Sequence, residues 1–226
     1  MANAAVATHS GKGIIWNKLK GTGTEPLNIQ WGDSTVTASA ATNVNLFKPQ
    51  TEARTAGTST LVTTTSNCLA DTYKVVGSIT CAVGAKTITE VALFNTTTVS
   101  PTTTLSASLT ASATAVTIAS LTGFPTSGAY YAQIENETVL VTGANSTTLT
   151  IARGSLGSTS ATHASAVPYT IGGDGMAIGT SATTGQTVAA ATLLAAGGDM
   201  LLHADFAGIA LSVADSINFT ITDQLT

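Results

Sequence analysis

The chain has 226 residues, which suits one large or two small domains. Charged residues make up 9% of it, against about 25% in an ordinary soluble domain, and hydrophobic residues make up 43%, which excludes the composition of a disordered chain. The net charge is −4 and the cationic residues are scattered, so we expect no direct contact with nucleic acid. No apolar run reaches the roughly 18 residues that cross a bilayer, so we expect no membrane span. The first residues do not resemble a secretion signal, so we expect synthesis in the cytoplasm without export.

The first 24 residues are polar and rich in glycine, which predicts an extended arm. One compact apolar patch interrupts them, formed by Ile14, Ile15 and Trp16. Buried aromatic side chains tend to dominate interface energies, so we interpret this patch as a partner-binding anchor on another chain. The alternative is that residues 1–24 contain the first edge strand of the domain itself.

Residues 25–95 alternate between apolar and polar side chains, which predicts the first part of a β-sandwich. The alternation is seen at 27–31 and 44–46, residues 58–65 are rich in β-branched side chains, and strands are also predicted at 73–80 and 87–94. Gly77 lies inside one of these segments and indicates a bulge. The alternation slips at Glu90–Val91, where either a bulge or a strand buried on both faces would explain the sequence.

Residues 95–104 have the composition of a linker, and residues 105–169 then form a compact block with its own rhythm of strands and turns. Strands are predicted at 116–118 and 148–151, and a hairpin joins 131–134 to 138–142 around Glu135-Asn136-Glu137. This spacing predicts a small all-β module.

Residues 172–226 are predicted to complete the sandwich with strands at 200–206 and 216–222, and residues 186–196 are a weak helix candidate. The fold class expected is therefore all-β: an antiparallel β-sandwich, of jelly-roll or immunoglobulin-like type, with a second small all-β module inserted. The expected parts are an arm at 1–24, a sandwich from 25–95 plus 172–226, and the inserted module at 105–169.

The titratable side chains do not form a recognisable catalytic or metal-binding motif. His9, His163 and His203 lie far apart, and neither H-E-x-x-H nor C-x-x-C occurs, so no metal or other cofactor is expected. His203 has the setting of a satisfied core or interface histidine, and His163 that of a residue that hydrogen-bonds a turn.

Two pairs of side chains are candidates for a catalytic site or a disulfide bond. Glu135 and Glu137 are two residues apart, which predicts one solvated strand face. Cys68 and Cys81 either pair across a hairpin or serve as small buried apolar residues.

Two segments resemble the last strands of a β-sandwich found in minor virion proteins of tailed bacteriophages. They are TITEVALFN at 87–95 and MLLHADFAGIALSVADSINFTIT at 200–222. Those proteins tend to carry an I-T-E-V-G-L-F-type strand and a closing G-D-S-I-x-F-T-type strand. Here Ala92 and Ala214 stand where the two patterns have glycine.

Residues 109–169 resemble a small β-module seen in many phage structural proteins. Its marks are the turn Gly123-Phe124-Pro125, the strand Glu137–Val141, the turn Leu149–Gly154 and the stretch Ala161–Val167. The two resemblances together cover about two thirds of the chain, and neither implies a catalytic residue.

The resemblance implies a non-enzymatic structural protein of the phage virion. We expect a capsid cement or decoration protein that binds the major capsid protein shell as a homo-oligomer, a trimer or dimer. The alternative is a neck, tail or fibre component bound to other virion proteins. A surface rich in Thr and Ser and poor in charge fits assembly, because little charge must be desolvated at an interface. The start of the sequence does not favour a secreted adhesin, because it does not resemble a secretion signal. The absence of a catalytic motif does not favour a hydrolase.

Overall fold

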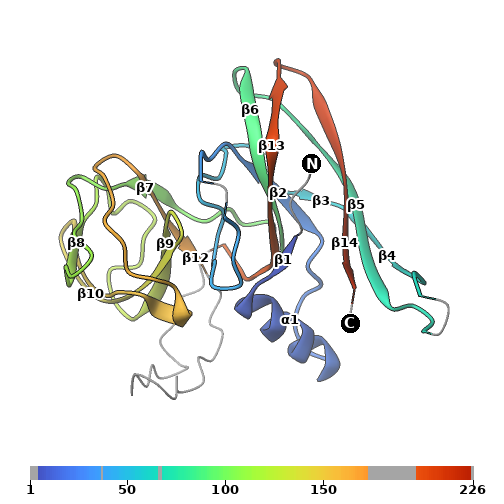
Figure 1. Cartoon of the computed structure of the whole chain (residues 1–226), viewed down its shortest axis with the longest axis horizontal. Helices are drawn as coiled ribbons and strands as arrows, with labels where there is room; N and C mark the ends of the chain where they lie inside the picture. The colour runs from blue at the N-terminus through green and yellow to red at the C-terminus, as the bar shows by residue number, and fades with distance from the viewer. Residues whose placement is uncertain (1–4, 37, 66–67, 173–196, 225–226) are drawn as a thin grey trace.

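The computed structural model describes residues 5–36, 38–65, 68–172 and 197–224. Within them the chain forms three antiparallel sheets and a single α-helix, so the all-β prediction is confirmed (Figure 1). Figure 1 shows two units side by side: two facing sheets with the helix beneath them, and a curled sheet next to them.

The first unit contains a five-stranded and a three-stranded sheet. The order in the larger sheet is β1 (Val6–Ala7), β13 (Met200–Leu211), β6 (Lys86–Phe94), β2 (Asn28–Gly32) and β3 (Thr55–Ala56). The order in the smaller sheet is β14 (Ser216–Gln224), β5 (Thr72–Thr80) and β4 (Thr58–Val62).

The two sheets pack face to face through one apolar core, which gives this unit a sandwich-like form. Trp31 of β2 meets Phe219 of β14 edge to face, with ring centroids 6.4 Å apart. The core around this contact includes Ile29, Val75, Ile79, Ile88, Leu93, Leu202 and Ile221. Burial of such side chains is the main stabilising contribution in a chain with few charges.

The slip in alternation at Glu90–Val91 reflects a strand buried on both faces, the second of the two alternatives. β6 is the central strand, between β13 and β2, and its residues 90–94 are all buried. The irregularity in pairing lies on the partner strand, where the register of β13 shifts between Asp205 and Ile209.

Gly77 does not form the predicted bulge, because β5 and β14 pair in one unbroken register through it. Its small size serves a close approach instead. A Cβ atom at Gly77 would lie 2.9 Å from the Gly57 Cα and 2.9 Å from the Ile29 side chain. The glycine therefore lets the two sheets come together above β2.

The second unit is a six-stranded sheet formed by residues 102–172. Its order is β7 (Thr102–Thr104), β12 (Pro168–Gly172), β9 (Tyr130–Ile134), β10 (Glu137–Asn145), β11 (Thr148–Ala152) and β8 (Ala115–Thr117). The predicted hairpin is present as β9 and β10. The prediction of a linker through residue 104 was wrong, since Thr102–Thr104 pairs with β12.

This sheet, called the β-module below, curls until its two ends meet. An isolated bridge joins Leu105, just after β7, to Ile118, just after β8. The backbone N–H of Ser106 donates to the carbonyl of Thr117 at 2.8 Å across the same seam. The apolar side chains inside form a core separate from that of the sandwich, with Val116, Tyr130, Ile134, Val139, Leu149, Tyr169 and Ile171 among its members.

Residues 42–48 join the two units, and they are not the strand that their alternation predicts. Val44 packs against Tyr131 and Leu140 of the β-module. Leu46 packs on the other side, in the sandwich, against a cluster that includes Phe94. The alternation therefore records a segment buried between two units, with Val44 facing one and Leu46 facing the other.

The segment expected to be an extended arm contains helix α1 (His9–Leu19). Thr8 caps it by accepting a hydrogen bond from the Gly11 N–H at 3.0 Å. Two internal glycines disfavour a helix by about 1 kcal/mol each, so local propensity points away from one. Tertiary packing decides otherwise: a Cβ at Gly11 would lie 2.2 Å from the Leu201 carbonyl oxygen, so glycine lets α1 rest on β13.

Two further expectations concern the helix candidate and the cysteines. The helix candidate at 186–196 lies outside the described residues. Cys68 and Cys81 are both free thiols, and only Cys81 is buried. They flank opposite ends of β5, which at about 3.3 Å per residue places them too far apart to pair.

Candidate functional sites

The turn of the β9–β10 hairpin places two acidic side chains at one end of the β-module. The strands pair through Glu137 opposite Ile134, so Glu135 and Asn136 make a two-residue connection. Glu135 has φ 49°, the left-handed conformation that such tight turns require. The two carboxylates are therefore held next to one another, on the side where the segment after β11 passes.

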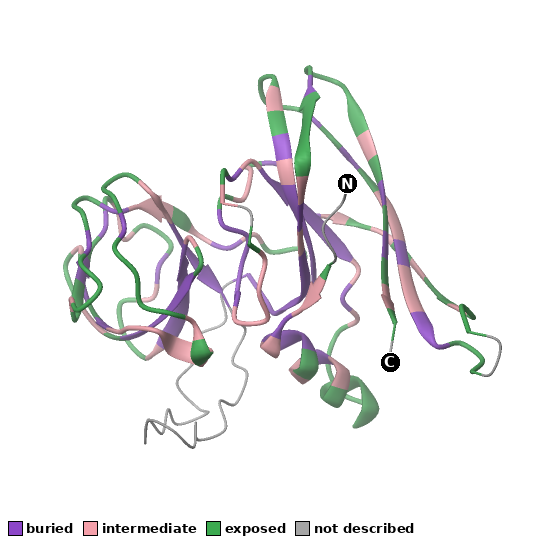
Figure 2. Ribbon diagram, in the orientation of Figure 1, coloured by how far each residue is buried: buried purple, intermediate pink, exposed green. Residues whose placement is uncertain are grey.

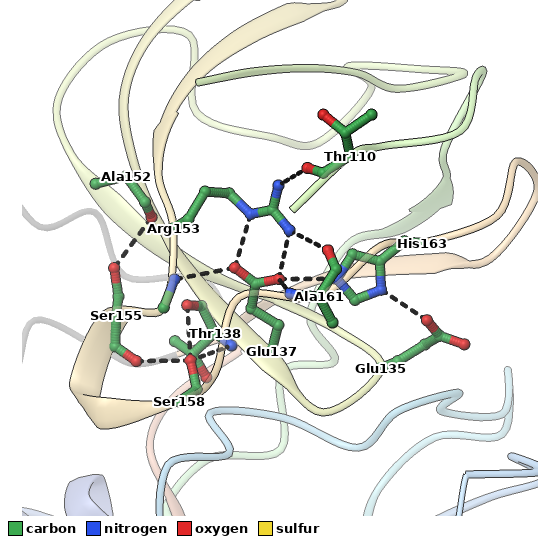
Figure 3. Close-up of polar contacts among 11 residues, drawn as sticks. Thr110, Glu135, Glu137, Thr138, Ala152, Arg153, Ser155, Ser158, Ala161 and His163 are labelled. Atoms are coloured by element: carbon green, nitrogen blue, oxygen red, sulfur yellow. Dashed lines mark hydrogen bonds and ion pairs between the residues drawn. The ribbon is translucent and has the colours of Figure 1, made fainter. Parts of the chain in front are cut away.

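Glu137 is fully enclosed, which contradicts the predicted solvated face. Its side chain is 0% exposed. Arg153 donates two hydrogen bonds to it, from Nε to Oε1 at 2.7 Å and from Nη2 to Oε2 at 2.6 Å (Figure 3). The backbone N–H groups of Gly154 and Ala161 donate to it at 2.9 and 3.1 Å. His163 adds a contact from Nε2 at 2.9 Å.

Arg153 and His163 tie this carboxylate to the loops around it. Arg153 also donates to the carbonyls of Thr110 and Ala161. His163 forms a bridge with Leu109 through its backbone, and its Nδ1 lies 2.6 Å from Glu135 Oε2. The Glu137 cluster, defined as Glu135, Glu137, Arg153 and His163, thus joins the hairpin to two other segments of the β-module.

Hydrogen bonds shift the pKa values of Glu137 and His163 in opposite directions. Burial alone would raise the pKa of Glu137, but hydrogen bonds from Arg153, His163 and the two backbone N–H groups outweigh it and lower that pKa to about 2. Burial alone would lower the pKa of His163, but its hydrogen bonds to Glu137 and Glu135 raise it. The ionised form of Glu137 and the protonated form of His163 thus favour one another.

This arrangement is suited to holding loops together. A carboxylate has about four lone-pair positions, and the donors around Glu137 occupy all of them. The same donors keep it ionised, whereas a general acid at neutral pH needs a raised pKa. The Glu137 cluster is therefore suited to holding the surrounding loops in place.

The sandwich contains a second buried glutamate–histidine pair, Glu90 and His203. Glu90 accepts hydrogen bonds from the backbone N–H groups of Phe47 and Lys48 at 3.0 and 2.8 Å. His203 Nε2 lies 2.9 Å from Glu90 Oε2, and its Nδ1 lies 3.0 Å from Asn43 Oδ1. This confirms the interpretation of His203 as a satisfied core histidine, and it shows that the pair fixes segment 42–48 onto β6 and β13.

A third feature is an apolar groove on the surface between α1, β4 and β5. It has a volume of about 580 Å³, and its lining includes Ile15, Leu19, Pro26 and Leu61. Leu19 is 72% exposed and Leu61 66% exposed, both unusually high for leucine. Figure 2 shows the exposed C-terminal end of α1 beside this region. We call this feature the α1 groove.

The predicted anchor is divided by the helix. Three consecutive residues of an α-helix point in different directions, about 100° apart. Ile14 is 4% exposed and belongs to the core of the chain itself, so a partner does not reach it. Ile15 packs partly against that core, and Trp16 is 66% exposed.

In the described part of the chain, no group of three or more His, Cys, Asp or Glu side chains is placed to hold a metal ion. No helix among these same residues is long and apolar enough to span a membrane. Comparisons with family models, curated proteins and solved structures found no match to this chain.

Proposed function

We propose that this chain is a non-enzymatic structural protein of a tailed-phage virion, which acts as a capsid cement protein bound to the major capsid protein. The observation that carries the assembly part of this proposal is the α1 groove. Its exposed leucines, Leu19 and Leu61, form an apolar surface on a chain with few charged residues. Contiguous exposed apolar surface of this kind marks sites of protein contact.

The virion part of the proposal is supported by the positions of the motif residues. Glu137, Arg153 and His163 come from separate motifs of the resemblance and meet in one cluster. Glu90, from the TITEVALF segment, holds segment 42–48 in place. These four motif residues thus hold loops in place, which fits a structural role.

Analysis of virus particles tests the proposal directly. Particles would be purified from cells that carry the gene, and the chain would be sought and counted by quantitative mass spectrometry. We expect copies in the hundreds, because a cement protein follows the repeating contacts of the shell. A few copies per particle would instead support the neck, tail or fibre component. Particles that lack the chain would overturn the virion assignment.

A substitution tests the α1 groove. Leu19→Ala shortens an exposed side chain that lines the groove, so we expect binding to particles to weaken by about tenfold or more while the thermal midpoint stays unchanged. The matched control is Val213→Ala, which shortens an exposed apolar residue in the β13–β14 turn. Equal binding by both variants and the unmodified chain would exclude the α1 groove as the contact surface.

A further inference from the structure

Strand β14 has one paired and one open edge. All nine of its residues pair with β5, and no other strand among the described residues pairs with it. An edge strand of this length presents a row of backbone donors and acceptors to solvent, and natural proteins usually block such a row with lysine, proline or a bulge. β14 has the sequence SINFTITDQ, with one charged residue, Asp223, and an unbroken register.

An apolar groove adjoins the open edge. It lies between β13 and β14, has a volume of about 580 Å³, and is lined by Phe206, Ile217, Phe219 and Ile221 among others. Figure 1 shows the cause: β13 and β14 meet at their common turn and then diverge. The Phe206 and Phe219 rings pack here with centroids 6.5 Å apart. An added strand would therefore gain backbone hydrogen bonds at β14 and apolar contacts beside it.

We propose that a second copy of this chain occupies the edge, its β14 pairing antiparallel with the first β14 about a two-fold axis at Thr220. The three-stranded sheets of the two copies then continue into a single sheet. Pairing of strand edges is an established mode of protein recognition. An interface of one surface with itself is the commonest basis of homodimers.

The sequence of β14 favours this register. Centring on Thr220 pairs every residue of the strand with another of the same strand. On the inner face it brings Phe219 of one copy opposite Ile221 of the other, and aromatic with β-branched pairs stabilise sheets. Centring one residue earlier would bring Asp223 opposite Asp215, and like charges directly opposite are destabilising.

β4, at the other edge of the same sheet, is a poorer candidate for this pairing. It has five residues, against nine in β14. Strand length distinguishes the two edges, because an apolar groove adjoins each of them. The choice of edge can therefore be tested within one sheet.

The test measures the mass of the purified full chain in solution by analytical ultracentrifugation. The unmodified chain should show a dimer in equilibrium with monomer. Thr220→Lys brings two ammonium groups face to face on the axis, so dimerisation should weaken by at least about tenfold. Thr58→Lys, at an exposed position of β4 that lies opposite Val76 as Thr220 does, is the matched control and should leave dimerisation unchanged.

A mixing experiment identifies the partner. Thr220→Glu alone should also be monomeric, whereas an equimolar mixture of the Lys and Glu variants should recover the dimer, since only a self-pair about residue 220 brings the two charges together. A monomeric unmodified chain, a dimer insensitive to Thr220→Lys, or an equal effect of Thr58→Lys would each overturn the inference.

This inference gives the proposed assembly function a specific partner, and in that sense it rests on that function. Its test uses the purified chain alone, so the two can fail separately. A chain found in particles but monomeric in solution would exclude the pairing of β14 with itself and leave the virion role. A chain that dimerises but is missing from every particle would exclude the virion role and leave the pairing.

Discussion

The β-module and the sandwich each bury a glutamate against a histidine, but they do so with different partners. In the β-module, Glu137 faces Arg153 as well as His163, and a second carboxylate, Glu135, faces the same histidine. In the sandwich, the groups that face Glu90 are His203 and two uncharged backbone N–H groups. The first arrangement is a network of charges, and the second a hydrogen-bonded joint.

The difference reflects what each pair holds. The Glu137 cluster closes the β-module, a small unit that must order the long segments between its short strands. Hydrogen bonds to charged groups are roughly twice as strong as neutral ones, so a few of them suffice. Glu90 instead secures one segment onto a sheet that already has a large apolar core. The cost of removing a partner should differ accordingly.

The largest effect is expected from Arg153→Met. This change leaves Glu137 buried without its main counter-charge, and breaking a buried ion pair in this way costs about 3–5 kcal/mol. We expect the β-module to lose protection from hydrogen exchange while the sandwich keeps it. Both tryptophans, Trp16 and Trp31, lie in the sandwich unit, so tryptophan fluorescence reports on that unit alone.

Two variants sharpen this comparison. Arg153→Lys restores the charge without the two-pronged geometry, so it should recover part of the loss. Glu90→Gln, in the sandwich, keeps the shape but disturbs the bonds to segment 42–48, and we expect about 1–3 kcal/mol from that change. If Arg153→Met and Glu90→Gln affected both units equally, the two units would unfold as one.

A smaller effect should follow the pH dependence of the β-module. The pKa of His163 is raised in the folded chain, so its stabilising contribution is complete below its ordinary value of 6.5 and is lost as pH rises through the folded value. The pKa of Glu137 is lowered from 4.5 to about 2, so its contribution is complete above 4.5 and is lost as pH falls toward 2.

Both contributions are therefore complete between about pH 4.5 and 6.5. The measurement is the urea midpoint of the β-module across pH, followed by hydrogen exchange, for the unmodified chain and for His163→Gln. The stabilising advantage of the histidine should shrink at alkaline pH. An advantage that stays constant up to pH 9 would mean that the ring is not charged in the folded chain.

Alternation along the sequence was sufficient to predict the strands but not what covers them. Residues 131–134 and 216–222 lie in strands as predicted, because each repeats apolar side chains at a spacing of two. The burial of Glu137 could not be read from the same spacing, since the segment containing Arg153 and His163 that encloses it is distant in sequence. The available signal was that all three residues belong to motifs of one resemblance.

Helix α1 shows a second limit of the same kind. Gly11 weakens a helix locally, yet it is the residue that allows contact with Leu201. Val44 and Leu46 show the converse, since their spacing is that of a strand and yet each packs on a different unit. In these cases contacts between distant segments outweigh the local pattern, and one sequence alone does not reveal such contacts.

The smallest expected effect is a gain, and it comes from the turn between β13 and β14. Asp215 donates its backbone N–H to the Ser212 carbonyl at 3.1 Å, and Ala214, the third residue of this turn, has φ 75°. That conformation costs an L-residue roughly 1–2 kcal/mol and costs glycine almost nothing, although glycine loses about 0.5–1 kcal/mol more entropy on folding. Ala214→Gly should therefore stabilise the sandwich by about 0.5–1 kcal/mol, measured as a rise in the urea midpoint by tryptophan fluorescence.

Ala210→Gly, at an exposed position inside β13, is the control and should lower the same midpoint, because there glycine brings only the entropic loss. A loss of stability in both variants would mean that the turn gains nothing from glycine, and the glycine in the resembled phage pattern would then need a reason other than backbone strain.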